Sequence, residues 1–98
     1  MKFAQIIEFS TRRIDDLSAY FDEWIRASEG DRIPHRAVLQ ADRDAENLYL
    51  LTVEFASHQQ AVENSGRPRT AEFARFLRSI CDGDLTFRNL DVVREDDL

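Results

Sequence analysis

Histidine is the residue type in this chain best suited to acid–base catalysis, and the sequence contains two, His35 and His58. An imidazole exchanges a proton near neutral pH, so either side chain could act as a general acid or base. His35 follows Pro34 at the start of a predicted strand, where it could lie at the edge of a cavity. His58 opens a predicted helix, where a solvated position in the first turn is the simpler interpretation.

The sequence offers no complete set of metal ligands. The two histidines would need at least one further ligand, and no acidic residue stands at a spacing that supplies it. The single cysteine, Cys81, excludes an internal disulfide and a metal site built from cysteines. Cys81 ends a helical pattern, where a small buried residue is the plainer interpretation. We therefore expect no metal.

Three further residues could contact or act on a ligand. Trp24 lies on the apolar arc of a predicted helix, where it could pack in the core or line a cavity. Tyr49 could bury its ring and direct its hydroxyl at a cavity or at water. Arg88 is a third candidate for catalysis beside the histidines. It neighbours Asn89 in the last predicted strand, where alternation turns only one of the two side chains toward the helices.

Two predicted strands, Lys2–Phe9 and Leu48–Phe55, carry apolar residues on both faces. This pattern indicates central strands that are covered on both sides. Weaker strands are predicted at His35–Ala41 and Leu85–Val93. The polar loop 42–46 joins the second and third strands as a hairpin.

Helical spacing of apolar residues fills the two intervals between these strands. The serine of an S-x-x-Q capping box precedes the second helix, and a Gly-x-Pro sequence interrupts it. Ser10-Thr11 offers the cap of the first predicted helix, whose helical pattern runs from Ile14 and ends at Gly30. The second predicted helix has Ser57 as cap, starts at His58 and is broken over 64–68. Thr70 caps the piece after the break, and Gly83 closes it.

The resulting order, β-α-β-β-α-β, predicts an α+β domain of the ferredoxin-like type, with a four-stranded antiparallel sheet and both helices on one face. Right-handed crossovers place the first and third strands in the centre, in agreement with their apolar faces. We expect one domain over residues 1–98, in which the acidic tail 94–98 is frayed.

The helix-free face of such a sheet would expose several large apolar side chains. Leu48 and Leu50 would lie beside Ile6, or beside Phe3 and Ile7, in a patch of about several hundred Å². At about 25 cal/mol per Å², covering this patch would contribute on the order of 10 kcal/mol before association costs. A homodimer packed sheet to sheet is the expected solution. A monomer with a partly apolar face is the alternative.

Charge and hydropathy narrow the possible partners. The net charge of −6 opposes binding to phosphate backbones, and no basic stripe compensates for it. No apolar segment reaches the ~20 residues of a transmembrane helix, and the first residues lack the pattern of a signal peptide. We expect a cytoplasmic protein that binds neither nucleic acid nor membranes.

Three stretches resemble a known family: the opening KFAQIIEF, the aromatic first helix with Trp24, and VEFASHQQAVENS followed by TAEFARFLRSIC. They are similar to the dimeric α+β barrel superfamily, specifically to the antibiotic-biosynthesis-monooxygenase-like (ABM-like) domains. The resemblance covers nearly the whole chain and implies a small cavity between the sheet and the helices of each subunit. Members include cofactor-independent oxygenases of polycyclic aromatic substrates, haem-degrading enzymes and isomerases.

The resemblance to the haem-degrading members is poor. They place an Asn on the first strand, a Trp near the second helix and a haem-ligating His within that helix. The present chain has Gln5 on the first strand, its tryptophan on the first helix, and His58 at the start of the second. We therefore expect no cofactor.

Two functions remain open on this basis. The first is a cofactor-independent monooxygenase or isomerase that acts on a small aromatic or polyketide-like molecule. The second is a non-catalytic dimeric module that binds a small ligand or a partner chain. An aromatic-walled cavity with one converging titratable group would favour the enzyme.

Overall fold

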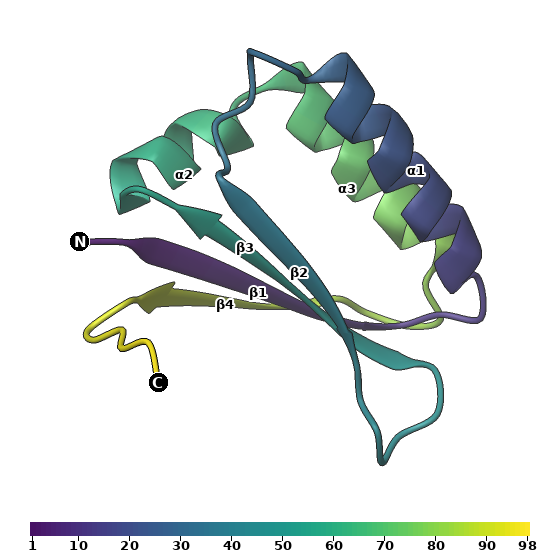
Figure 1. Cartoon of the computed structure of the whole chain (residues 1–98). Helices are drawn as coiled ribbons and strands as arrows, with labels where there is room; N and C mark the ends of the chain where they lie inside the picture. The colour runs from purple at the N-terminus through teal and green to yellow at the C-terminus, as the bar shows by residue number, and fades with distance from the viewer.

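The computed structural model describes residues 1–98 and contains one four-stranded antiparallel sheet with three helices. The sheet order is β2-β3-β1-β4, and all three helices lie on one face of it (Figure 1). The elements in chain order are β1 (Phe3–Ser10), α1 (Ile14–Ala27), β2 (Arg36–Ala41), β3 (Leu48–Phe55), α2 (His58–Ser65), α3 (Pro68–Ile80) and β4 (Thr86–Asp91). The predicted ferredoxin-like α+β arrangement is confirmed.

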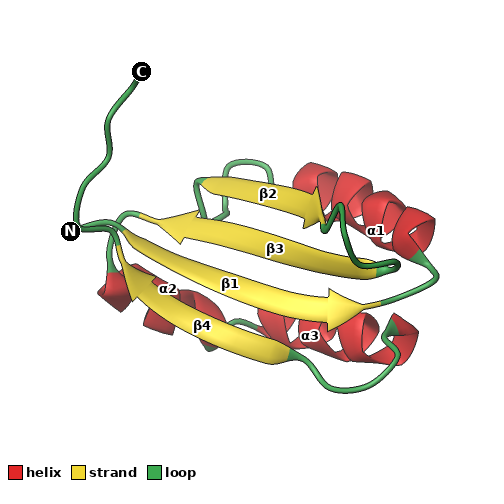
Figure 2. Ribbon diagram, turned by 90° about the horizontal axis from the view of Figure 1, so that it is seen from below, coloured by secondary structure: helices red, strands yellow, loops and turns green.

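The two central strands are β1 and β3, as the apolar faces of their sequences predict. They pair antiparallel over their whole length, from Phe3 opposite Phe55 to Ser10 opposite Leu48. The shorter β2 and β4 form the edges (Figure 2). Edge strands contact one neighbour only, which explains why their sequences are less apolar.

Two of the predicted helix caps are wrong. The N-cap of α1 is Arg13, without a side-chain bond. The Thr11 hydroxyl accepts from the N–H of Arg13 itself and donates to the carbonyl oxygen of Ile80 at 2.6 Å. Helix α3 begins at Pro68, two residues before the predicted cap at Thr70. Proline fits the first helical position because that position needs no N–H donor. The capping box before α2 is confirmed, with the Gln60 N–H donating to Ser57 Oγ at 3.2 Å.

The strand register assigns each side chain to one face of the sheet. Odd-numbered residues of β1 and β3, such as Ile7 and Leu51, face the helices and belong to the core. Even-numbered residues therefore face away from the helices. The apolar members of that face, which we call the apolar sheet patch, are Ala4, Ile6, Val38, Leu48, Leu50 and Leu90.

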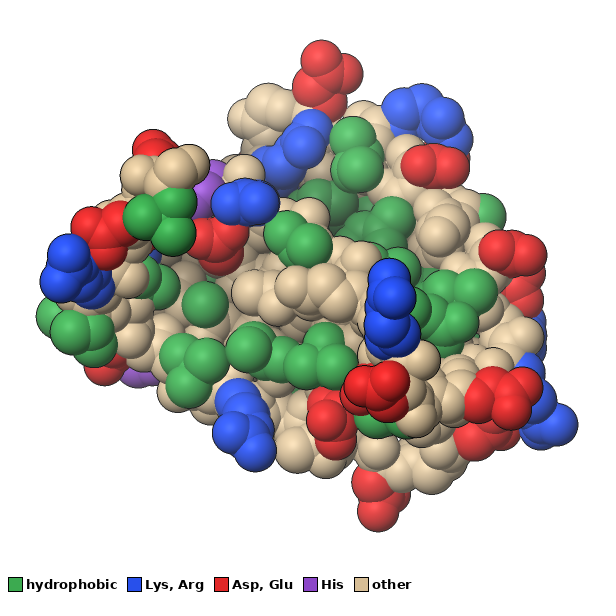
Figure 3. Space-filling view, turned by 60° about the horizontal axis from the view of Figure 1, so that its bottom comes forward, with side chains coloured by type: hydrophobic (Ala, Val, Ile, Leu, Met, Phe, Trp, Pro, Cys, Tyr) green, Lys and Arg blue, Asp and Glu red, His purple; other side chains and the backbone are tan.

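Hydrophobic side chains gather across the middle of the surface below the sheet, and many of the charged ones lie toward its edge (Figure 3). In the single chain, Ile6 and Leu50 are half-buried and Leu90 is 41% exposed. No helix covers this face (Figure 2). The apolar sheet patch is therefore open to a partner surface.

The core lies between the helices and the sheet. Its most buried large side chains are Phe9, Leu17, Leu51 and Leu77, each at most 1% exposed. Aromatic rings extend the core toward α3, where Tyr20 stacks on Phe76 at 4.3 Å between ring centroids. Burial raises the pKa of the Tyr20 hydroxyl, so this ring stays neutral within the helix interface. None of the three helices is long and apolar enough to cross a membrane.

Cys81 packs against this core at the end of α3, and burial raises the pKa of its thiol, with Asp82 adding to the effect. The thiolate is the reactive form of cysteine. At roughly pH 8, we therefore expect iodoacetamide to alkylate Cys81 several-fold more slowly in the native chain than in the chain unfolded in urea. As the pH is raised, the alkylation rate of the native chain should increase at a higher pH than that of the unfolded chain. Equal rates and equal pH profiles would contradict the burial of the thiol. The chain has a single cysteine, so mass spectrometry reports this site alone.

Candidate ligand-binding cavity

A cavity of about 280 Å³ lies between the sheet and the helices, near the end of α1 and the break between α2 and α3. Its lining is mostly apolar and strongly aromatic. The aromatic members come from α1, β3, α3 and β4: Phe21, Trp24, Phe55, Phe73 and Phe87. Phe87 lies on the helix side of the edge strand β4, opposite Ile7, and is 45% exposed.

Helices α1 and α3 form one wall of the cavity. Phe21 and Phe73 pack together across these helices, with ring centroids 5.4 Å apart and planes inclined by 44°. One turn further along α1, Trp24 continues the same wall. Apolar residues three to four positions apart share one face of a helix, which brings these rings together.

The segment between α1 and β2 forms the rim of the cavity. The C-cap of helix α1 is Ser28, which is fully buried and donates from Oγ to the Trp24 carbonyl oxygen at 2.6 Å. Gly30 then adopts a φ of +77°, a left-handed conformation that glycine accepts without strain. The rim re-enters the sheet at His35, whose backbone N–H donates to the Glu54 carbonyl oxygen at 3.0 Å.

The break between α2 and α3 closes the neighbouring side of the rim and is tied to it. The Arg67 guanidinium donates to the Asp31 carbonyl oxygen at 2.5 Å and lies 3.4 Å from the Asp31 carboxylate. Arg69 lies 3.9 Å from the same carboxylate. Asn64 and Thr70 stand on either side of this break, and both line the cavity. The arginine contacts therefore hold two segments that are distant in sequence at one opening.

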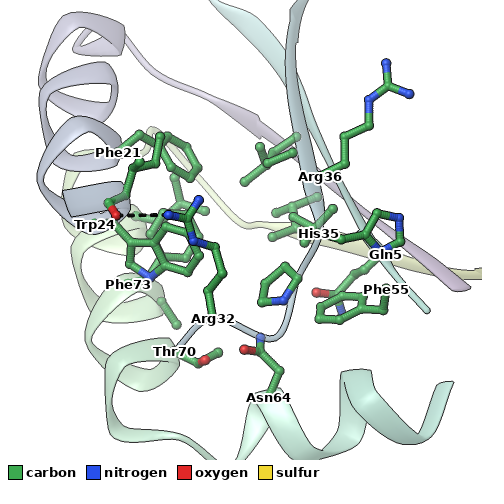
Figure 4. A pocket seen from close by; sticks show the side chains of 18 of the residues that line it. Gln5, Phe21, Trp24, Arg32, His35, Arg36, Phe55, Asn64, Thr70 and Phe73 are labelled. Carbon is green, nitrogen blue, oxygen red and sulfur yellow. Dashed lines mark hydrogen bonds between the residues drawn. The ribbon is translucent and has the colours of Figure 1, made fainter. Parts of the chain in front are cut away.

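Few polar groups line the cavity, and none of them is a carboxylate. They are Gln5, Arg32, His35, Arg36, Asn64 and Thr70. Gln5 donates from Nε2 to Asn89 Oδ1 at 3.1 Å, which orients its amide on the sheet floor. The Arg32 guanidinium lies over the Trp24 ring, 5.9 Å from its centroid. Arg36 points away from the other labelled side chains, toward Glu54 at 3.5 Å (Figure 4).

Trp24 and His35, two of the residues singled out in the sequence, both line the cavity. They do not contact each other in Figure 4, where Trp24 lies beside Arg32 and the His35 ring points toward the side of Phe55 and Gln5. His35 is exposed at the rim, as expected for a cavity edge. Their chemical roles remain predictions.

The other three candidates lie outside the lining. Tyr49 faces the helices but stacks on Phe9, with ring centroids 6.0 Å apart. His58 packs edge-on against Phe3 at the start of β1, with ring centroids 4.9 Å apart. Arg88 is exposed and pairs in register with Ile6, so it projects from the helix-free face.

Sequence reasoning missed five polar residues of the lining: Gln5, Arg32, Arg36, Asn64 and Thr70. Arg32 belongs to the connection 28–35 between α1 and β2. Asn64 and Thr70 lie in the last turn of α2 and the first turn of α3, on either side of a break that the glycine and proline signals had marked only as a break. Segments that break helices next to a predicted cavity are a usable signal, because connecting segments often carry binding residues. The structure brings together no group of three or more His, Cys, Asp or Glu side chains that could hold a metal ion.

The comparisons with known proteins agree on the architecture. No family model matches the sequence, and no curated protein sequence matches it significantly. Among solved structures, a variant of SnoaB, a cofactor-independent oxygenase from Streptomyces nogalater, superposes with a TM-score of 0.78 at 14% identity, over 96% of this chain and 95% of that one. The chain has an ABM-like fold. The protein Rv0793 from Mycobacterium tuberculosis superposes with a TM-score of 0.75 at 17% identity, over 99% and 100% of the two chains.

A structure described as an antibiotic biosynthesis monooxygenase superposes on the ABM-like domain with a TM-score of 0.71 at 12% identity, over 94% of this chain and 99% of that one. In each case the two chains are nearly the same length, so the likeness extends over the whole domain. At these identities the comparison establishes the backbone arrangement. The identity of the residues in the cavity has to be read from this chain alone.

Proposed function

We propose that the cavity binds a small aromatic molecule and that the protein is a homodimeric, cofactor-independent monooxygenase acting on it. The observation that carries this proposal is the aromatic lining with a few polar groups at its rim, on a fold shared with the cofactor-independent oxygenase SnoaB. Aromatic walls match the faces of a planar ligand, and sparse polar groups fix its orientation.

His35 is the candidate base, because it is the only residue of the lining whose side chain is of a type that serves as a general base. A substrate such as anthrone, in which a CH₂ group and a carbonyl bridge the same two aromatic rings, would lose a proton to His35 and become a resonance-stabilised carbanion. The carbanion transfers electrons to O₂ and forms a C–O bond, giving a hydroperoxide after protonation. Loss of water leaves a carbonyl, so CH₂ and O₂ become C=O and H₂O. An isomerase would use the same proton removal without O₂.

Anthrone is a suitable probe, since its acidic CH₂ group becomes the second carbonyl of anthraquinone. We expect the protein to accelerate both O₂ uptake and anthraquinone formation, in a ratio of one to one. Replacement of His35 by glutamine should lower the rate by about 10² or more, the usual contribution of a general base. The matched control is His58→Gln, which removes the histidine that lies outside the cavity and should leave the rate unchanged.

A rate no faster than buffer would contradict the oxygenase proposal. Equal rates for the wild type and His35→Gln would remove His35 as the base. The exposure of His35 favours the second candidate, a non-catalytic module, because a solvated imidazole gains little from a water-excluded site. Binding of anthrone without O₂ uptake would support that module.

A further inference from the structure

Arg32 is the one cavity residue whose charged group is both directed at the cavity and free of a carboxylate partner. Its guanidinium makes a single hydrogen bond, from Nη2 to the Ile25 carbonyl oxygen at 3.2 Å (Figure 4). Seven other arginines form ion pairs with Asp or Glu: Arg12, Arg13, Arg26, Arg36, Arg67, Arg69 and Arg94. Arg36 also borders the cavity, but its charge is paired with Glu54.

The neighbourhood of Arg32 keeps its charge available. The nearest acidic residue in sequence is Asp31, and its carboxylate pairs with Arg67 and Arg69. No Asp or Glu lines the cavity, although the chain as a whole has a net charge of −6. The negative net charge of the protein repels anions over most of its surface, whereas the unpaired guanidinium at this rim attracts them.

The position of the guanidinium also suits a specific ligand shape. It lies 5.9 Å from the centroid of the Trp24 ring, at the edge of the aromatic wall. A guanidinium carries five N–H donors in a planar fork, and one of them is engaged with Ile25. The remaining donors can bind both oxygens of a carboxylate at once, and this bidentate geometry is the strongest recognition that arginine offers.

We propose that Arg32 forms an anion subsite at the rim and that the ligand of the cavity is an aromatic carboxylate. The ring system packs against Trp24 and Phe73, and the carboxylate reaches the Arg32 fork. This assignment rests on the proposed function in one respect, namely that the cavity binds a small aromatic molecule.

Two probes of equal shape test the assignment: 2-naphthoate, which is anionic, and 2-naphthamide, which is neutral. Trp24 is the only tryptophan, so its indole N–H gives a single two-dimensional NMR signal that reports binding at the cavity. Titration of the wild-type chain should give about tenfold tighter binding of 2-naphthoate, as a charge-assisted bidentate contact predicts.

Three variants identify the source of this preference. Arg32→Gln should weaken 2-naphthoate about tenfold and leave 2-naphthamide within about twofold. Arg32→Lys keeps the charge but loses the fork, so the affinity for 2-naphthoate should be intermediate. Arg43→Gln is the matched control, because it removes the same charge from the polar loop between β2 and β3 and should change neither affinity.

The outcomes separate the two proposals. Equal binding of both probes, or an equal loss of both in Arg32→Gln, would show that Arg32 is only part of the wall, and would overturn the anion subsite while cavity binding stands. An equal loss in Arg43→Gln would attribute the preference to net charge and would also overturn the subsite. If neither probe shifts the Trp24 signal, both the subsite and the binding of aromatic molecules by the cavity are wrong.

Discussion

Replacement of Leu50 by arginine is expected to convert the proposed homodimer into a folded monomer. Leu50 belongs to the apolar sheet patch and lies on the central strand β3, directly opposite Glu8. In a sheet-to-sheet dimer the new guanidinium would lose its water, which costs several kcal/mol and is repaid only in part by an ion partner such as Glu8. The dimer dissociation constant should therefore rise by about a hundredfold or more.

The same substitution is mild for the isolated subunit, since Glu8 offers the arginine a partner across the strands. Sedimentation equilibrium at micromolar concentration should give twice 11.4 kDa for the wild type and 11.4 kDa for Leu50→Arg. Circular dichroism should show that the variant remains folded. Gln59→Arg, on the exposed surface of α2, introduces the same charge away from the sheet and should stay dimeric. If the wild type has the mass of a single chain, 11.4 kDa, the proposed homodimer is wrong.

The sheet could be predicted from the sequence because its central strands carry an unusual pattern. Lys2–Phe9 and Leu48–Phe55 are apolar at both odd and even positions, a pattern typical of the central strands of a sheet. The observed central strands, β1 and β3, match these two predicted strands to within one residue at each end. Helix limits were harder to predict, because Pro68 signals a break and a first helical position equally well.

The cavity could be predicted only in part. Trp24 was identifiable because helical spacing places it on the core face of α1, and His35 because a strand begins next to it. Tyr49 and Arg88 depend on the strand register, in which one residue decides the face of the sheet and the neighbouring partner. Arg32 had no periodic signal at all, since the position of its guanidinium follows from Gly30, Ser28 and the contact with Trp24.

Thr11 joins three parts of the fold through one hydroxyl group, so Thr11→Val should destabilise the protein more than its conservative shape suggests. The side chain is fully buried. Its Oγ1 donates to the Ile80 carbonyl oxygen at the end of α3, at 2.6 Å, and accepts from the Arg13 N–H before α1, at 3.0 Å. Valine fills the same space but leaves both backbone groups without this partner.

Unsatisfied buried polar groups cost about 1–3 kcal/mol each. The Arg13 N–H is only partly buried, so the free energy of unfolding should fall by less than two full penalties, about 2–4 kcal/mol. Urea denaturation at constant m-value measures this change. Thr11→Ser keeps the hydroxyl and loses one methyl group, so it should cost only about 1 kcal/mol. If both variants lose the same free energy, the methyl group and not the hydroxyl joins the ends of α3 and β1. Because Thr11 lies outside the cavity lining, binding at Trp24 should be the same in both variants under conditions where they are folded.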